Sequence, residues 1–212
     1  MIKRTEIKYP FKNGDRIASL SYLTRHSFYQ TYPARRISSL YFDTMDFKFH
    51  YLGEEGIVPR DKVRLRWYGH EKFNLNKVTF EIKKTFASSR IKYSKRFVEL
   101  DNNTIEKSGH LLFYKHLIDT NVLLPTVLVT YDRMYFENWD NSRATIDSNI
   151  KYHKCILTPE NQLITLQCVN EEFNVLELKD EISKMAEQIQ KSRAIWLRFS
   201  KYSRAMVGLL KK

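Results

Sequence analysis

The chain has 212 residues, of which 42% are hydrophobic, so it is long enough for one sizeable core and its composition excludes a disordered chain. Lys and Arg number 36 against 24 Asp and Glu, a net charge of +12 that predicts anionic partners. The N-terminal segment is charged, and no apolar run approaches the roughly 20 residues that a membrane helix needs. We therefore expect a soluble, cytoplasmic protein with no transmembrane segment.

The first half of the chain predicts strands with one helix between them. Residues 2–9 alternate between apolar and charged side chains, as a half-buried strand does. Residues 13–30 predict a helix, with Asn13 or Asp15 as its cap and Pro33 closing the segment. Further strands are predicted at residues 36–43, 60–69, 77–85 and 91–99.

The second half begins with a predicted helix over residues 103–120, whose leucines form an apolar stripe. Short strands bounded by turn residues follow at residues 126–137, 142–147, 153–157, 163–168 and 173–179. Residues 181–193 and 198–210 predict two C-terminal helices. Cys155 and Cys168 form neither a metal motif nor a disulfide framework, so we expect two buried thiols.

These elements favour an α+β fold that is mainly antiparallel β. About eight strands dominate, and the βαβ rhythm of a parallel sheet is absent from the pattern. We therefore expect an antiparallel barrel or sandwich with peripheral helices, built as a single domain over residues 1–212.

The polar faces of the predicted strands are charged with unusual regularity. Four of the five faces mix cations with carboxylates, and the face of Arg64 with Arg66 is cationic alone. The mixed faces are Glu6 with Lys8, Glu81 with Lys83, Arg143 with Thr145 and Asp147, and Glu177 with Lys179. One interpretation is a set of solvated faces with cross-strand ion pairs. The other is a closed barrel whose charged faces point inward and form a cationic lumen.

A cationic lumen suits a phosphate chain. Arg offers a bidentate fork to each phosphoryl group, and Lys offers a point charge. The carboxylates would hold Mg²⁺ or Mn²⁺, which bridge carboxylate and phosphate oxygens. Tyr131 and Tyr135, among other aromatic residues, are interpreted as packing residues rather than base-stacking platforms.

Eight segments resemble, in order, those of VTC domains, which belong to the triphosphate tunnel metalloenzyme or CYTH-like superfamily. They are RISSLYFDT (36–44), KVRLRWYG (62–69), EIKK (81–84), SKRF (94–97), TYDR (130–133), RATID (143–147), LELK (176–179) and RFSKYSRAM (198–206). The resemblance covers roughly residues 2–207. It implies an eight-stranded, closed antiparallel β tunnel that polymerises polyphosphate from the γ-phosphate of ATP with Mn²⁺ or Mg²⁺.

The resemblance also implies a role for individual positions. Arg64, Arg66 and Lys201 are expected to be catalytic, and Glu177, Glu6 and Glu81 are the expected metal ligands. The expected phosphate-binding residues are Lys8, Arg64, Arg66, Lys83, Lys95, Arg133, Arg143, Lys179, Ser200 and Lys201. ATP and inorganic polyphosphate are the expected ligands, no nucleic acid is expected, and a membrane partner would be needed for export.

One departure from the superfamily bears on the reaction. Hydrolytic relatives begin with Glu-x-Glu-x-Lys, whereas this chain has Arg4 in place of the first Glu. The change removes a potential metal ligand and adds a cation, which favours a polymerase. A tripolyphosphatase or nucleoside triphosphatase, and a polyphosphate-binding module without catalysis, stay open as alternatives.

Overall fold

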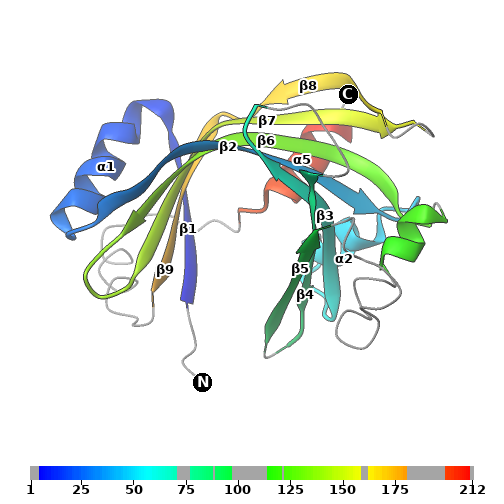
Figure 1. Cartoon of the computed structure of the whole chain (residues 1–212), viewed down its shortest axis with the longest axis horizontal. Helices are drawn as coiled ribbons and strands as arrows, with labels where there is room; N and C mark the ends of the chain where they lie inside the picture. Colours follow the sequence, from blue (N-terminus) through cyan, green and yellow to red (C-terminus); the bar gives the residue numbers. More distant parts are fainter. Residues whose placement is uncertain are drawn as a thin grey trace. The chain divides into compact units, whose positions relative to one another are not determined.

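A computed structural model describes residues 5–70, 77–87, 89–96, 114–120, 122–158, 162–180 and 199–210. Within them the chain forms a mainly antiparallel sheet of nine strands with few helices (Figure 1). The strands pair in the order β1-β9-β7-β6-β2-β3-β4-β5, and β8 pairs with β7 outside this path. The count exceeds the predicted eight, and the pairing among the described residues ends at β1 and β5.

The chain divides into two compact units, and each is described by itself. Unit 1 consists of Met1–Arg36, Tyr131–Ile150 and Asn170–Ser200. Unit 2 consists of Ile37–Thr130, Lys151–Val169 and Lys201–Lys212. Three long strands, β2 (Tyr29–Asp43), β6 (Leu124–Glu137) and β7 (Arg143–Leu157), have residues in both units.

Unit 1 pairs β1 (Thr5–Lys12) with β9 (Phe173–Asp180), and β9 with β7. The 3-10 turn η1 (Asn13–Asp15) and helix α1 (Arg16–Arg25) follow β1. Alternate residues of the strands, such as Ile7, Ile146 and Leu178, form a core with Leu23 of α1. The other face of these strands is left for polar side chains.

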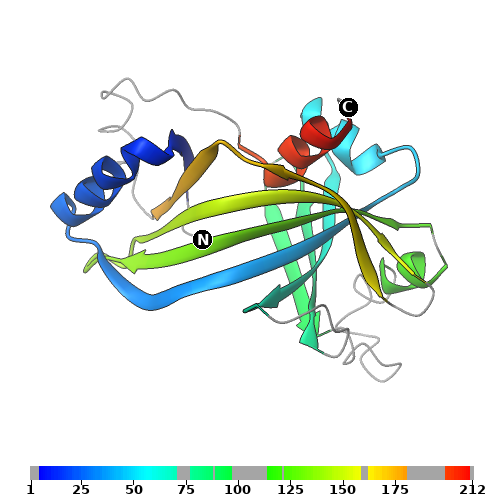
Figure 2. The same ribbon diagram turned by 90° about the horizontal axis from the view of Figure 1, so that it is seen from above.

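Unit 2 pairs β2 with β3 (Arg60–Tyr68), β3 with β4 (Thr79–Thr85), and β4 with β5 (Arg90–Arg96). Strand β8 (Leu163–Asn170) lies beside β7. Val63 and Leu65 of β3 and Phe80 and Ile82 of β4 form a core that is almost fully buried. Helices α2 (Lys48–Glu54) and α5 (Lys201–Leu210) lie near each other in Figure 2.

Several predicted boundaries are wrong. The first helix ends at Arg25, and Pro33 lies inside β2 because that strand begins at Tyr29. The predicted strands 142–147 and 153–157 are one continuous strand, and helix α2 was not predicted. Asp15 precedes α1 but its side chain makes no capping hydrogen bond.

Other predictions are confirmed in part. Residues 114–119 are helical, and α5 confirms most of the last predicted helix. Residues 103–113 and 181–193, and Arg4, lie outside the described residues. Cys155 is buried as expected, but Cys168 is exposed, and neither forms a disulfide. No helix in the described part of the chain has the length and apolar character that membrane crossing requires.

Candidate functional site

In unit 2 a basic face is built by the alternation of β3. Val63 and Leu65 point into the core, so Arg64 and Arg66 point to the opposite side of the sheet. The register places Arg64 opposite Glu81 of β4, so both side chains lie on this face.

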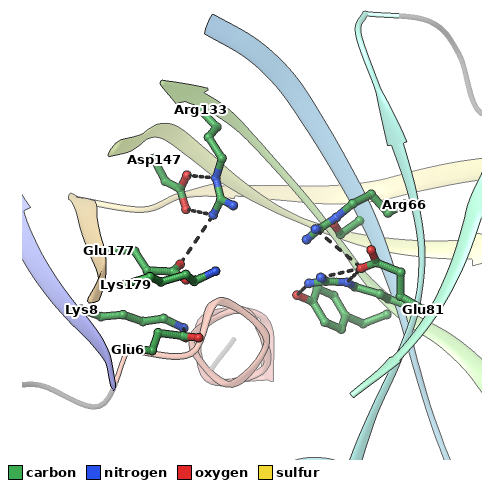
Figure 3. A network of polar contacts seen from close by, with 11 residues as sticks. Glu6, Lys8, Arg66, Glu81, Arg133, Asp147, Glu177 and Lys179 are labelled. Atoms are coloured by element: carbon green, nitrogen blue, oxygen red, sulfur yellow. Dashed lines mark hydrogen bonds and ion pairs between the residues drawn. The ribbon is translucent and has the colours of Figure 1, made fainter. Parts of the chain in front are cut away.

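Glu81 is the centre of this face (Figure 3). Arg64 donates from Nε to Glu81 Oε2 at 2.7 Å, and Lys92 Nζ lies 2.6 Å from Oε1. Arg66 lies further away, with 3.6 Å between Nη1 and Oε2. Burial alone would raise the pKa of Glu81, but the positive charges of Arg64, Arg66 and Lys92 lower it to about 2.

Three lysines form a row across this face, which we call the lysine row. Lys62 of β3 is opposite Lys83 of β4, and Lys83 is opposite Lys92 of β5. Like charges directly opposite each other destabilise a sheet. A pocket is lined by Lys62, Arg64, Glu81, Ile82, Lys83 and Lys92. The positive charge of this row would suit a bound polyanion.

The prediction identified Lys83 but missed Lys62 and Lys92. Strand alternation could have indicated both lysines. Lys62 lies on the same face of its strand as Arg64, and Lys92 lies on the same face of its strand as Ser94. Lys95 was predicted to bind phosphate, but it lies opposite the buried Phe80. Its side chain therefore starts from the other face of the sheet, and the structure does not bring it into the cluster around Glu81.

Tyr41 of β2 joins this cluster. Arg64 Nη1 donates to Tyr41 Oη at 3.0 Å, and the Arg64 guanidinium lies 5.7 Å from the centre of the ring. Burial would raise the pKa of Tyr41, but Arg64, Arg66 and Lys62 outweigh burial and lower it to about 8. The local positive charge therefore makes the Tyr41 hydroxyl more acidic than that of an ordinary tyrosine.

Helix α5 is anchored beside Tyr41. Tyr202 stacks on Tyr41 with 5.1 Å between ring centres, and its hydroxyl donates to Asp43. Asp43 also accepts from the backbone N–H groups of Phe49 and His50, and so caps α2. The predicted Lys201 is the first residue of α5, half-buried and adjacent to Tyr202. Ser200 immediately precedes the helix and belongs to unit 1.

In unit 1 a second polar face is formed by β1, β9 and β7. Glu177 of β9 is opposite Lys8 of β1 on one side and Thr145 of β7 on the other. Lys179 is opposite Glu6 and Arg143 in the same way. The alternation predicted from the sequence therefore places all of these side chains on one face.

Arg133 of β6 links two carboxylates of this face (Figure 3). It donates to both oxygens of Asp147, at 2.5 and 2.7 Å, and its Nη2 lies 3.7 Å from Glu177 Oε2. Burial opposes the charge of Arg133, but the Asp147 carboxylate outweighs burial and holds the pKa of Arg133 well above its ordinary value. The pair is a rigid, bidentate contact with Asp147 fully buried.

Glu177 is surrounded by positive charge. Burial would raise its pKa, but Lys8, Lys179 and Arg133 outweigh burial and hold the pKa of Glu177 well below its ordinary value. Lys179 Nζ lies 2.9 Å from Oε1 of this carboxylate. Glu177 is therefore a carboxylate at any physiological pH.

The other predicted residues lie on the same face with different exposure. Lys8 pairs with Glu6 at 3.1 Å, and both side chains are partly exposed. Arg143 pairs with Glu137 at 3.4 Å and keeps 66% of its side chain exposed. Thr145, which the prediction placed on this face without a role, has a buried hydroxyl for which the described residues provide no hydrogen-bond partner.

The carboxylates differ in how well their contacts would allow them to hold a metal ion. No three His, Cys, Asp or Glu side chains of the described residues gather closely enough to hold a metal ion. In unit 1, Glu177 and Glu6 are hard oxygen donors that suit Mg²⁺ or Mn²⁺, with the Thr145 hydroxyl beside Glu177 as a further oxygen. Glu81 fits less well, since Arg64 and Lys92 occupy its two oxygens.

The chain matches the model of a known domain family. The VTC domain matches residues 3–210, so the chain belongs to the VTC domain family, as its motifs predicted. Membership implies that the domain handles phosphate chains. No curated protein matches the chain.

Solved structures share the fold at low identity. A protein from Pyrococcus horikoshii OT3 is 14% identical, with a TM-score of 0.53 over 99% of this chain and 100% of that chain. A putative adenylyl cyclase from Hippeastrum, described as having a dominant triphosphatase activity, is 11% identical, with a TM-score of 0.53 over 97% and 96%. A putative adenylate cyclase from Bacillus halodurans is 14% identical, with a TM-score of 0.50 over 92% of each chain.

Proposed function

We propose that this protein transfers phosphoryl groups onto a polyphosphate chain, with the γ-phosphate of ATP as the donor and Mn²⁺ or Mg²⁺ as the metal. The observation that carries the proposal is the lysine row Lys62, Lys83 and Lys92, in which like charges face each other across three strands. Such a row concentrates positive charge on one face of the sheet, which suits an anion with several charges. An enclosed tunnel, as in the family resemblance, is part of the proposal.

The two polar faces differ in their balance of charges, which supports a different role for each in binding. In unit 2 the cations around Glu81 are Lys62, Arg64, Arg66, Lys83 and Lys92, and their excess suits the polyanionic chain. In unit 1 the cations alternate with carboxylates, Glu177 among them. That mixture suits a phosphate group that binds together with a divalent metal.

Catalysis would come from alignment and charge stabilisation. A terminal phosphate oxygen of the polymer attacks the γ-phosphorus of ATP, a new P–O bond forms, and the bond to the β–γ bridging oxygen breaks so that ADP leaves with the electron pair. Arg64 and Arg66 would hold the oxygens of the transferred group. Lys201 would neutralise charge on the reacting phosphates, and Glu177 would hold the metal, which stabilises that charge.

Synthesis is preferred to hydrolysis because of the first strand. Arg4 stands where hydrolytic relatives have a Glu, so one carboxylate of their metal site is missing. Glu6, the next acidic position, pairs with Lys8 at 3.1 Å. Fewer carboxylates and more cations favour retention of a polyanionic product over its release.

The test is product analysis with ATP and Mn²⁺. The wild type should form a long anionic polymer, visible on a gel stained for polyanions, whereas Arg66→Ala and Glu177→Gln should lose at least about 100-fold in rate because each removes charge from the reacting groups. Lys115→Ala, which removes a cation from an exposed helix pair with Asp119, is the matched control and should be fully active.

Orthophosphate without polymer would identify a hydrolase. Full activity in both Arg66→Ala and Glu177→Gln would exclude the proposed site. Circular dichroism of each variant shows whether its fold is retained.

A further inference from the structure

An aromatic and cationic cluster lies in unit 1, outside the polar network already described. Tyr32 of β2 and Tyr135 of β6 meet edge to face, with 6.0 Å between ring centres. The Arg35 guanidinium lies 5.4 Å from the centre of the Tyr32 ring and 6.0 Å from that of Tyr135. Tyr32 is 56% exposed and Arg35 is also exposed. These residues are called the tyrosine cluster.

The tyrosine cluster continues the face that carries Arg133. Tyr135 follows Arg133 by two residues in β6, so strand alternation places both side chains on one face, with their Cα atoms roughly 7 Å apart. The contact of Arg133 with the Tyr131 ring, 5.3 Å from its centre, shows the same alternation. Arg143, paired with Glu137, adds a further exposed cation where β6 ends.

The chemistry of the tyrosine cluster differs from that of a phosphate site. A phosphate binds cations and hydrogen-bond donors, and a tyrosine ring offers it little. A nucleobase, in contrast, stacks on aromatic rings and on the guanidinium plane of Arg. A packing role would bury Tyr32, whereas more than half of its surface meets solvent.

We propose that Tyr32, Arg35 and Tyr135 bind the nucleobase of a nucleoside triphosphate whose phosphates bind beside Arg133. This inference deepens the proposed function and rests on it, since the phosphates must lie on the Arg133 face. The cluster provides stacking surfaces and no set of amide groups that would read one base, so it would accept purine nucleotides by shape and stacking.

The experiment compares ATP with inorganic tripolyphosphate, which has the phosphates but no base. Calorimetry should show that Tyr32→Ala weakens ATP binding roughly tenfold, the loss typical of one stacking ring, and leaves tripolyphosphate binding unchanged. Tyr32→Phe should retain ATP affinity because it keeps the ring. Tyr51→Ala, which removes a similarly exposed tyrosine from α2, is the control and should alter neither ligand.

The outcomes separate this inference from the proposed function. If the wild type binds both ligands and Tyr32→Ala leaves ATP binding unchanged, or weakens both ligands equally, the nucleobase inference is wrong while phosphate binding stands. If the wild type binds neither ligand, the proposed function itself fails. If an oligoadenylate without a triphosphate binds as tightly as ATP, a single-stranded nucleic acid site replaces the nucleotide site.

Discussion

At the scale of single residues, Thr145 allows a test of whether the polar face of unit 1 binds a ligand. Its hydroxyl is buried on the face of β7 that carries Asp147 and lies opposite Glu177 in β9. The described residues leave this hydroxyl without a hydrogen-bond partner, which costs on the order of 1–3 kcal/mol. A bound phosphate or metal would satisfy it.

Replacing Thr145 with Val keeps the shape of the side chain and removes the hydroxyl. We expect Thr145→Val to leave the free energy of unfolding unchanged or higher, because a group without a partner is lost. Affinity for tripolyphosphate with Mn²⁺ should fall about tenfold, the value of one hydrogen bond to a charged ligand. Denaturant unfolding and calorimetry measure the two quantities.

Thr24→Val is the control for Thr145→Val. The Thr24 hydroxyl is exposed and donates to the Leu20 carbonyl within α1, so its loss should leave affinity unaltered. Undiminished affinity in Thr145→Val would show that the hydroxyl does not contact the ligand. A loss of stability would show that it has a structural role.

At the scale of elements, the lysine row shows how strand pairing places like charges next to one another. Each lysine alone is an ordinary solvent-facing residue of its strand, but the register brings Lys62, Lys83 and Lys92 side by side. Glu81, two residues before Lys83, offsets part of this charge through its contact with Lys92. A bound polyanion would add further negative charge to this face.

Replacing the middle lysine should therefore change stability and ligand affinity in opposite directions. We expect Lys83→Gln to raise the free energy of unfolding by about 0.2–1 kcal/mol, since like charges no longer face each other. The same change should weaken tripolyphosphate binding about tenfold because a charged hydrogen-bond donor is lost. Thermal unfolding and calorimetry at fixed, low salt provide the measurements.

Lys115→Gln serves as the comparison for Lys83→Gln. Lys115 pairs with Asp119 one helical turn away at 2.5 Å, so its replacement should lower stability by less than about 0.5 kcal/mol. Tripolyphosphate binding should not change. Equal effects of the two substitutions on binding would mean that net charge, rather than the lysine row, attracts the ligand.

Helix α5 is positioned by polar contacts as well as by its apolar side. Tyr202 reaches Asp43 and stacks on Tyr41, while Ala205 and Met206 are buried on the helix. Asp43 also holds the start of α2, so one buried carboxylate fixes both helices. The residues LYFD of β2 therefore carry a structural role beside the motif that contains Lys201.

At the scale of the whole molecule, the buried carboxylates predict sensitivity to acid. The pKa of Glu81 is lowered from 4.5 to about 2, and that of Glu177 is lowered as well. A carboxyl group whose pKa is lowered in the folded state stabilises the protein at pH values above its ordinary pKa. This contribution is lost as the pH falls from 4.5 toward 2. Glu81 alone should contribute about 3 kcal/mol near neutral pH.

The Glu81→Gln variant tests this dependence. Denaturant unfolding at several values between about pH 6 and about pH 2 should show a steeper loss of stability in the wild type, with the two proteins converging at the acid end. Parallel curves for both proteins would mean that Glu81 does not carry the acid sensitivity.

The sequence predicted the strand character and the polar faces because period two is a local property of the chain. Arg64 with Arg66 and Glu177 with Lys179 share faces as expected, since alternation does not depend on which strand is the neighbour. Element boundaries were less predictable. Pro33 stops a helix in most contexts, but here it lies in a long strand whose pairing partners are distant in sequence.

By itself, the sequence determined the antiparallel β class, the charged strand faces and membership of the VTC domain family. The tertiary structure alone decided which charges meet: it placed Lys83 between two lysines and brought Arg133 to Asp147. The physical reason is that alternation fixes the face of a side chain within its own strand, whereas register, which depends on remote strands, fixes its neighbours.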